Sequence, residues 1–155
     1  LVDSSALSML MDKPLGTSIK LNVSGPNIYI KSIENAFGQE IDKPIITPAI
    51  KEFFSKQFSA RFTDQNSSDL IVDFSVDVVK QSKDKNEYGL YVAYASLYFS
   101  VYENKLGKEV YSDTVLDVQG AHFGSFDQAG IKALGNLSKQ LKEESLREMV
   151  QNLEG

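Results

Sequence analysis

Apolar and polar positions alternate along three consecutive stretches in the second half of the chain. An apolar residue stands at every second position between residues 69 and 80 and again between 88 and 102, and a looser alternation runs from 109 to 119. Such alternation is typical of a β-strand with one buried face. Residues 104–107 (Asn-Lys-Leu-Gly) supply hairpin-turn chemistry between the last two stretches. The pattern therefore predicts a three-stranded antiparallel meander.

Two other stretches carry apolar residues at three- and four-residue spacings, which predicts amphipathic helices. The first opens at Thr47-Pro48, where we expect threonine to cap the helix and proline to take the first helical position. The second opens at Ser125, a good N-cap, and can run to Val150. The apolar stripes are Ile50, Phe53, Phe54, Phe58 and Phe62 in the first helix, and Phe126, Ala129, Ala133, Leu137 and Leu141 in the second.

The N-terminal part of the chain gives weaker signals. Residues 18–23 alternate and predict a strand, whereas residues 1–16 form an arm of ambiguous structure. Residues 28–30 are expected to be a short extended piece, and residues 38–44 a loop.

The predicted order is β-α-β-β-β-α within a single domain over residues 1–155, with an N-terminal arm (1–16) and an α/β core (17–152). A meander with one apolar face must cover that face, and two amphipathic helices are available to do so. We therefore expect an α+β fold: a two-layer sandwich in which about four strands form a mostly antiparallel sheet, with both helices on one face.

Composition narrows the range of functions. The net charge is −5, whereas a nucleic-acid binder needs a basic surface. The absence of cysteine excludes a disulfide framework, a thiolate zinc site and a thiol nucleophile. Residues 120–125 lack the lysine of a phosphate-binding loop and the spacing of a dinucleotide fingerprint. We therefore expect no cofactor and no nucleic-acid partner. Since no apolar run approaches the roughly 18 residues of a membrane span, we also expect no transmembrane segment in this chain.

His122 is the only histidine and lies in a short loop between a predicted strand and the last helix. A catalytic triad would need an activated nucleophile beside it. Ser125 is near in sequence, but its position as a helix cap explains it without catalysis. A loop histidine bonded to the backbone is the favoured interpretation of His122, so we predict no catalytic residue.

Four aspartates are predicted to share one face of the meander: Asp73, Asp77, Asp113 and Asp117. On neighbouring strands they could approach a hard cation such as calcium, or they could simply be solvated. The first and third strands of a meander are separated by the second, and no calcium loop of the usual spacing is present. We therefore predict no metal site.

Tyrosines form the most informative surface pattern. Tyr94, Tyr98 and Tyr102 recur at a spacing of four, so they share one face of a strand, and Tyr111 is expected across the hairpin on the same side. In the third strand, Val110, Thr114, Leu116 and Val118 are the expected core-facing set. Exposed tyrosines are enriched in protein interfaces. Cross-strand aromatic pairing on an open face, or a covering by residues 1–11, would account for them too.

A set of sequence features resembles the small α/β domains of bacterial cell-envelope proteins. These features are the helix from Pro48 to Phe62, the strand entry Ser68-Asp69-Leu70-Ile71-Val72, the turn at residues 104–108, and the link into a helix bearing Ala133, Leu137 and Leu141. Domains with this pattern include the N-terminal domain of TolB, lipoproteins of curli secretion, of the flagellar motor and of penicillin-binding-protein activation, and the lipopolysaccharide-assembly lipoprotein. The resemblance implies a non-catalytic domain that assembles envelope machinery through protein contacts.

The leading hypothesis is therefore a non-enzymatic assembly or scaffolding domain in the bacterial envelope, which binds a protein partner through Tyr94, Tyr98, Tyr102 and Tyr111. The resemblance implies a periplasmic location, with an outer-membrane anchor through an upstream lipid as one arrangement. Two alternatives remain: a carrier of an apolar or lipid-like ligand near Phe54, Phe58 and Phe62, and a hydrolase using His122 or the aspartates. A homodimer formed through an exposed strand edge is also open.

Overall fold

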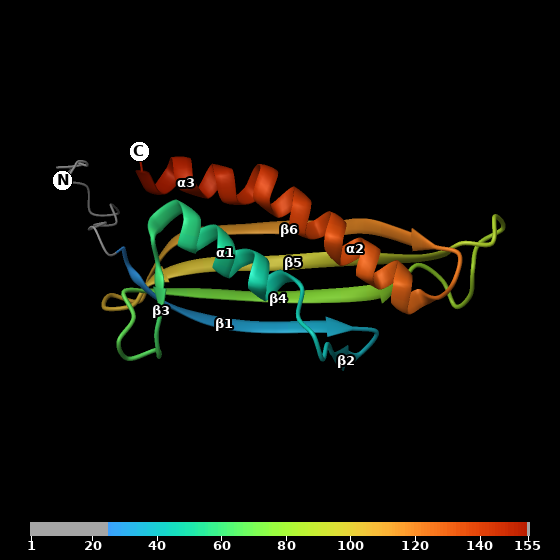
Figure 1. The fold of residues 1–155 in the computed structure, drawn as a ribbon, viewed down its shortest axis with the longest axis horizontal. Helices are drawn as coiled ribbons and strands as arrows, with labels where there is room; N and C mark the ends of the chain where they lie inside the picture. The colour runs from blue at the N-terminus through green and yellow to red at the C-terminus, as the bar shows by residue number, and fades with distance from the viewer. Residues whose placement is uncertain (1–24, 155) are drawn as a thin grey trace.

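The computed structural model describes residues 25–154, which form an α+β sandwich (Figure 1). Six strands make one sheet in the order β2-β1-β4-β5-β6, with β3 pairing to β1. The elements are β1 (Asn27–Ala36), β2 (Gln39–Glu40), α1 (Ile46–Phe58), β3 (Arg61–Phe62), β4 (Leu70–Lys80), β5 (Tyr91–Glu103), β6 (Lys108–His122), α2 (Phe126–Gln140), a π-helical segment η2 (Leu141–Ser145) and α3 (Leu146–Glu154). The predicted fold class is confirmed, and the sheet is larger than expected.

The first strand is where the prediction and the fold differ. The strand expected at residues 18–23 lies outside the described residues, and the short extended piece expected at 28–30 is a ten-residue strand, β1. β1 pairs with β4 in parallel, whereas β4, β5 and β6 form the predicted antiparallel meander. Helix α1 therefore lies in the crossover between two parallel neighbours, and the sheet is mixed. The segment expected to be a loop after β1 contains the two-residue strand β2.

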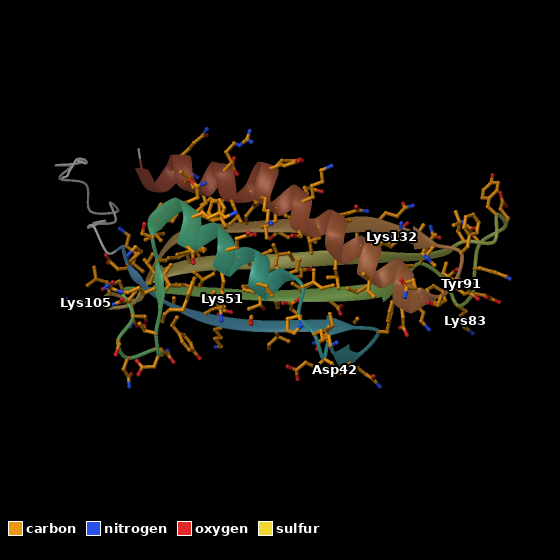
Figure 2. All side chains as sticks on the ribbon, in the orientation of Figure 1. Asp42, Lys51, Lys83, Tyr91, Lys105 and Lys132 are labelled. Atoms are coloured by element: carbon orange, nitrogen blue, oxygen red, sulfur yellow. The ribbon has the colours of Figure 1, made fainter. Side chains whose placement is uncertain are left out.

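Both helical stretches cover the same face of the sheet (Figure 1). α2 packs on β5 and β6, and α1 lies beside it on the same face. The core between the layers includes Phe74 from β4, Phe99 from β5, Phe54 from α1 and Leu137 from α2, each no more than 2% exposed. Figure 2 shows the two ends of the sheet, with Lys105 in the β5–β6 turn at one end and Lys83 in the β4–β5 loop at the other.

A glycine allows α2 to approach β6 closely. Gly120 faces the helix, and a Cβ placed there would come within 2.1 Å of the Ala133 nitrogen and 2.5 Å of the Ala129 carbonyl oxygen. Backbone packed this tightly leaves no room for any side chain. Gly120 therefore fixes the distance between the helix layer and the sheet.

The start of α1 is held by a buried carboxylate from β1. Glu34 is 4% exposed and accepts hydrogen bonds from the backbone N–H groups of Ile45, Ile46 and Thr47 at 2.7–3.0 Å. The predicted cap by Thr47, with Pro48 at the first helical position, is wrong: α1 begins at Ile46, and its N-cap residue Ile45 makes no side-chain capping bond. A carboxylate at a helix N-terminus satisfies free N–H groups and complements the helix dipole. Ser125 does cap α2, accepting the Gln128 N–H at 3.1 Å, as predicted.

Within residues 25–154, no helix has both the length and the apolar character needed to cross a membrane.

Candidate partner-binding face

The sheet face opposite the helices carries the predicted tyrosine stripe. Tyr94, Tyr98 and Tyr102 project from β5 on this face, paired with Val79, Ser75 and Ile71 of β4. Their neighbours in sequence, such as Leu97 and Phe99, face the helices and are buried. We refer to this side, opposite the helices, as the open face. No element among residues 25–154 packs over it.

The most exposed apolar part of the open face lies around Tyr98. The register places Ile33, Ser75, Tyr98 and Thr114 side by side on four adjacent strands. Ile33 and Tyr98 are each 52% exposed, and the small Ser75 lies between them. Leu116 on β6, two positions beyond Thr114, is 57% exposed. Exposed apolar side chains such as Ile33, Tyr98 and Leu116, gathered on one face of a sheet, are a feature that marks contact surfaces.

Polar residues border this row. Lys31 is paired with Asp73, and Asn35 with Asp77, on the β1–β4 side of the open face. Ser96 and Ser100 alternate with the tyrosines along β5. Tyr94 hydroxyl accepts a hydrogen bond from Gln81 Nε2 at 3.0 Å. The face thus combines exposed apolar groups with a polar surround, the composition expected of a non-obligate interface.

The prediction that Tyr111 shares this face is wrong. Tyr111 pairs with Val101, which points toward the helices, and it is only 8% exposed. Its hydroxyl donates to the Ser145 carbonyl oxygen at 3.1 Å and lies 3.3 Å from Glu148 Oε1. Burial, followed by the negative charges of Asp113 and Glu148, raises the pKa of the Tyr111 hydroxyl. Tyr111 therefore joins β6 to η2 and α3 and is not available to a partner.

A bulge in β6 explains this error. The regular pairing with β5 shifts between Ala95–Val118 and Leu97–Val115, so that Leu116 and Asp117 both lie opposite Ser96. Asp117 has a left-handed φ of 56°, and its N–H donates to Ser96 Oγ at 3.0 Å. An extra residue inverts the inward and outward positions on one side of it. Val118 accordingly faces the helices as predicted, whereas Thr114 and Leu116 face outward.

The same bulge separates the four aspartates. Asp73 and Asp77 lie on the open face of β4, Asp113 pairs with the inward Phe99, and Asp117 lies in the bulge. The expectation that all four share one face is therefore wrong. The described residues contain no cluster of three or more His, Cys, Asp or Glu side chains placed to hold a metal ion.

His122 ends β6, opposite Tyr91. Its Nδ1 accepts the Gly124 N–H at 2.8 Å, so this nitrogen is occupied by the local turn. This is the backbone-bonded arrangement that the sequence offered as the alternative to catalysis.

The phenylalanines considered for an apolar ligand belong to the packed core. Phe54 is fully buried and Phe58 is 8% exposed, with their ring centroids 5.8 Å apart. Phe62 is not on the helix, which ends at Phe58, but in the short strand β3. Phe54 and Phe58 thus belong to the buried core, whereas Phe62 is partly buried and packs against it.

A second surface feature, a groove of about 410 Å³, lies between α1 and the C-terminal helices. Its lining includes the apolar Phe53 and Val150 and the cations Lys56, Lys142 and Arg147. Glu52 forms ion pairs with Lys56 at 3.1 Å and Lys142 at 3.3 Å, and the hydrogen bonds from these two lysines hold the pKa of Glu52 below its usual range. Sequence reasoning missed this groove, because nothing in the sequence brings Lys142 next to residues of α1.

The fold is similar to several solved bacterial proteins. A protein of the DUF330 family from Xanthomonas campestris aligns with a TM-score of 0.50 at 14% identity, over 85% of this chain and 87% of that protein. Lipoprotein GNA1162 from Neisseria meningitidis gives 0.47 at 11% identity, over 78% of this chain and 98% of the other. The rare lipoprotein B from Shewanella oneidensis gives 0.44 at 10% identity, over 82% and 92%. No protein-family model and no curated protein sequence matches this chain. At these identities the likeness concerns the fold.

Proposed function

We propose that this protein is a non-catalytic domain of the bacterial cell envelope that binds a protein partner through its open face. The observation that carries the proposal is the row Ile33–Ser75–Tyr98–Thr114, which no element among residues 25–154 covers and in which two half-exposed apolar side chains flank a serine. The alternative that residues 1–11 cover this face concerns residues outside the described range. Tyr94 and Tyr102 extend the same surface along β5. Tyrosine suits a surface that is wet when free and dry when bound, because its ring is apolar and its hydroxyl can stay hydrated.

The envelope location follows from the resemblance of the sequence pattern to envelope domains. Some of the proteins with a similar fold are named lipoproteins, which agrees with the proposed envelope location. Anchoring at the outer membrane from the periplasmic side is the specific arrangement proposed.

The absence of catalysis is part of the proposal. The Nδ1 of the single histidine is taken by the Gly124 N–H, and the four aspartates lie at separated positions on the sheet. Neither group offers the paired nucleophile and base of covalent catalysis.

Site-specific photo-crosslinking in bacterial cells tests the proposal. A photoreactive side chain is placed at Tyr98 or Ile33 on the open face, and at Tyr88 as the control. Tyr88 is also an exposed tyrosine, at 74%, but lies in the β4–β5 loop. We expect one envelope protein to crosslink from positions 98 and 33 and not from 88.

The same partner should be lost when Tyr94, Tyr98 and Tyr102 are changed together to Ser, and retained with Tyr88→Ser. If a folded protein gives no crosslink from either open-face position, or the same products from all three positions, the open face is not the binding surface. A crosslink to a second copy of the chain would replace the partner with a homodimer.

A further inference from the structure

A second groove, of about 330 Å³, lies between strand β6 and the helical segment formed by η2 and α3. β6 is the last strand in the sheet order, so no strand among residues 25–154 pairs with its outer edge. Its pairing with β5 is regular from Tyr111 to Val115 and irregular on either side of that stretch. The groove therefore runs beside a short, straight piece of strand edge that no other strand of the described residues pairs with.

The charged residues that line this groove are all acidic. Asp113 reaches it from β6, and Glu144 and Glu148 reach it from the helical segment. None of the three takes part in an ion pair formed within the described residues. Three carboxylates around one groove, without a lysine or arginine, create a local negative potential that favours a cationic ligand.

A buried hydroxyl without a hydrogen-bond partner among the described residues lines the same groove. Ser145 lines the groove, is only 5% exposed, and its Oγ makes no hydrogen bond to any residue between 25 and 154. Buried polar side chains normally have a hydrogen-bond partner. The π-helical turn of η2 carries this serine, and such turns occur frequently at functional sites.

Among the described residues, a helix contact protects the edge of β6 near its far end, and none does so along this groove. Near the far end of the strand, Asn136 of α2 donates to the Gln119 carbonyl oxygen at 2.9 Å. Beside the groove, the Thr114 N–H donates to Asp113 Oδ1 at 2.8 Å, within the same strand. A side chain of β6 itself is more easily displaced than a packed helix, so this amide is open to an incoming strand.

We propose that the groove receives an extended basic segment of another protein, which adds to β6 as a new edge strand. Because side chains of a strand alternate, every second residue of that segment would enter the groove, where Lys or Arg would meet Asp113, Glu144 and Glu148. Main-chain hydrogen bonds to β6 supply affinity, and the carboxylates select a basic sequence. The groove meets the open face along β6, where Thr114 and Leu116 line both surfaces. The proposal rests on the strand edge and the three carboxylates, and does not depend on the partner proposed for the open face.

The test uses a capped peptide of alternating Lys and Val, titrated into the isotope-labelled protein and followed by NMR and calorimetry. We expect a Kd below about 1 mM at low salt, with amide shift changes and slower hydrogen exchange concentrated at residues 111–115. Two control peptides should not bind. One alternates Glu and Val, which reverses the charge. The other is the Lys–Val peptide with every second backbone nitrogen methylated, which blocks the hydrogen bonds of its pairing edge.

Two matched double variants distinguish binding at this groove from non-specific attraction between a basic peptide and an acidic protein. Glu144→Gln with Glu148→Gln should weaken binding about tenfold. Asp127→Asn with Glu143→Gln removes the same charge at exposed positions outside the groove lining and should leave binding unchanged.

The proposal is overturned if the Lys–Val peptide does not bind, or if the methylated peptide binds equally well. It is also overturned if both double variants lose the same affinity, or if the amide shift changes map away from β6. A stable dimer of the free protein that pairs the β6 edges of two copies would overturn it too, because the groove's edge would then already be occupied.

Discussion

The Glu34 carboxylate accepts both the hydroxyl and the N–H of Thr47, at 2.6 and 2.7 Å. One buried side chain on β1 thereby fixes the first turn of α1. Leaving buried N–H groups without an acceptor costs about 1–3 kcal/mol each. We expect Glu34→Ala to lower the free energy of unfolding by roughly 3–5 kcal/mol and Thr47→Val by about 1 kcal/mol, measured by urea denaturation.

The exposed Glu40 on β2 is the matched control, and Glu40→Ala should change the stability by less than about 0.5 kcal/mol. A loss in Glu34→Ala no larger than in this control would mean that the carboxylate does not hold the helix.

Gly120 and Gly135 should respond in opposite directions to the same substitution. Alanine at position 120 places a Cβ against the backbone of Ala129 and Ala133, so α2 must shift, and we expect a loss of roughly 2–3 kcal/mol or more. Gly135 lies in α2, and a Cβ there meets nothing within 4 Å. Gly135→Ala should therefore raise stability by about 0.5–1 kcal/mol. Thermal unfolding of the two variants checks both signs.

The bulge at Asp117 should tolerate glycine but not a β-branched residue. Its φ of 56° is in the left-handed region, which glycine adopts freely and valine does not. We expect Asp117→Gly to stay within about 0.5 kcal/mol of the wild type, and Asp117→Val to lose about 1–2 kcal/mol. If both variants unfold at the same urea concentration, the backbone at this position is not constrained as described.

Tyr111 should make the fold sensitive to strongly alkaline pH. Its pKa is raised in the folded protein, chiefly by burial, so the folded state keeps this proton when the unfolded chain has lost it above a pH of about 10. The stabilisation is complete below that pH and declines as the pH rises above it. Urea unfolding measured across this range should show a shallower decline in Tyr111→Phe than in the wild type.

At neutral pH, Tyr111→Phe should cost about 1 kcal/mol for the lost bond to Ser145. Tyr98→Phe removes the hydroxyl of a half-exposed tyrosine that has no such contact among the described residues, and should change the stability at neutral pH by less than about 0.5 kcal/mol. If the free energy of unfolding declines equally steeply above pH 10 in the wild type and in Tyr111→Phe, Tyr111 is not the source of the alkaline sensitivity.

The sequence predicted β4, β5 and both helical regions because each carries a long, unbroken hydrophobic period. It missed β1 because the inward positions of that strand include Ser32 and Glu34, while Ile33 points outward. A buried carboxylate breaks the alternation, and only the position of α1 explains it. Among the site residues, Tyr94, Tyr98 and Tyr102 share a face as predicted, because β5 has no bulge between them that changes their side.

Tyr111 was misplaced because a single extra residue at Asp117 inverts the alternation along β6, and alternation alone does not locate a bulge. The carboxylates beside Ser145 were equally invisible, since they come from a strand and a helix about 30 residues apart in the sequence.

The parallel pairing of β1 with β4 also has a consequence for the order of folding. Ile28 pairs with Leu70, more than 40 residues away, whereas β4, β5 and β6 join through consecutive hairpins. Closing the longer loop between β1 and β4 costs more chain entropy before any stabilising contact forms. The meander should therefore form in the transition state, and β1 and α1 should dock afterwards. Core truncations in β5 should slow refolding, whereas Glu34→Ala should leave the refolding rate nearly unchanged and mainly accelerate unfolding in stopped-flow experiments.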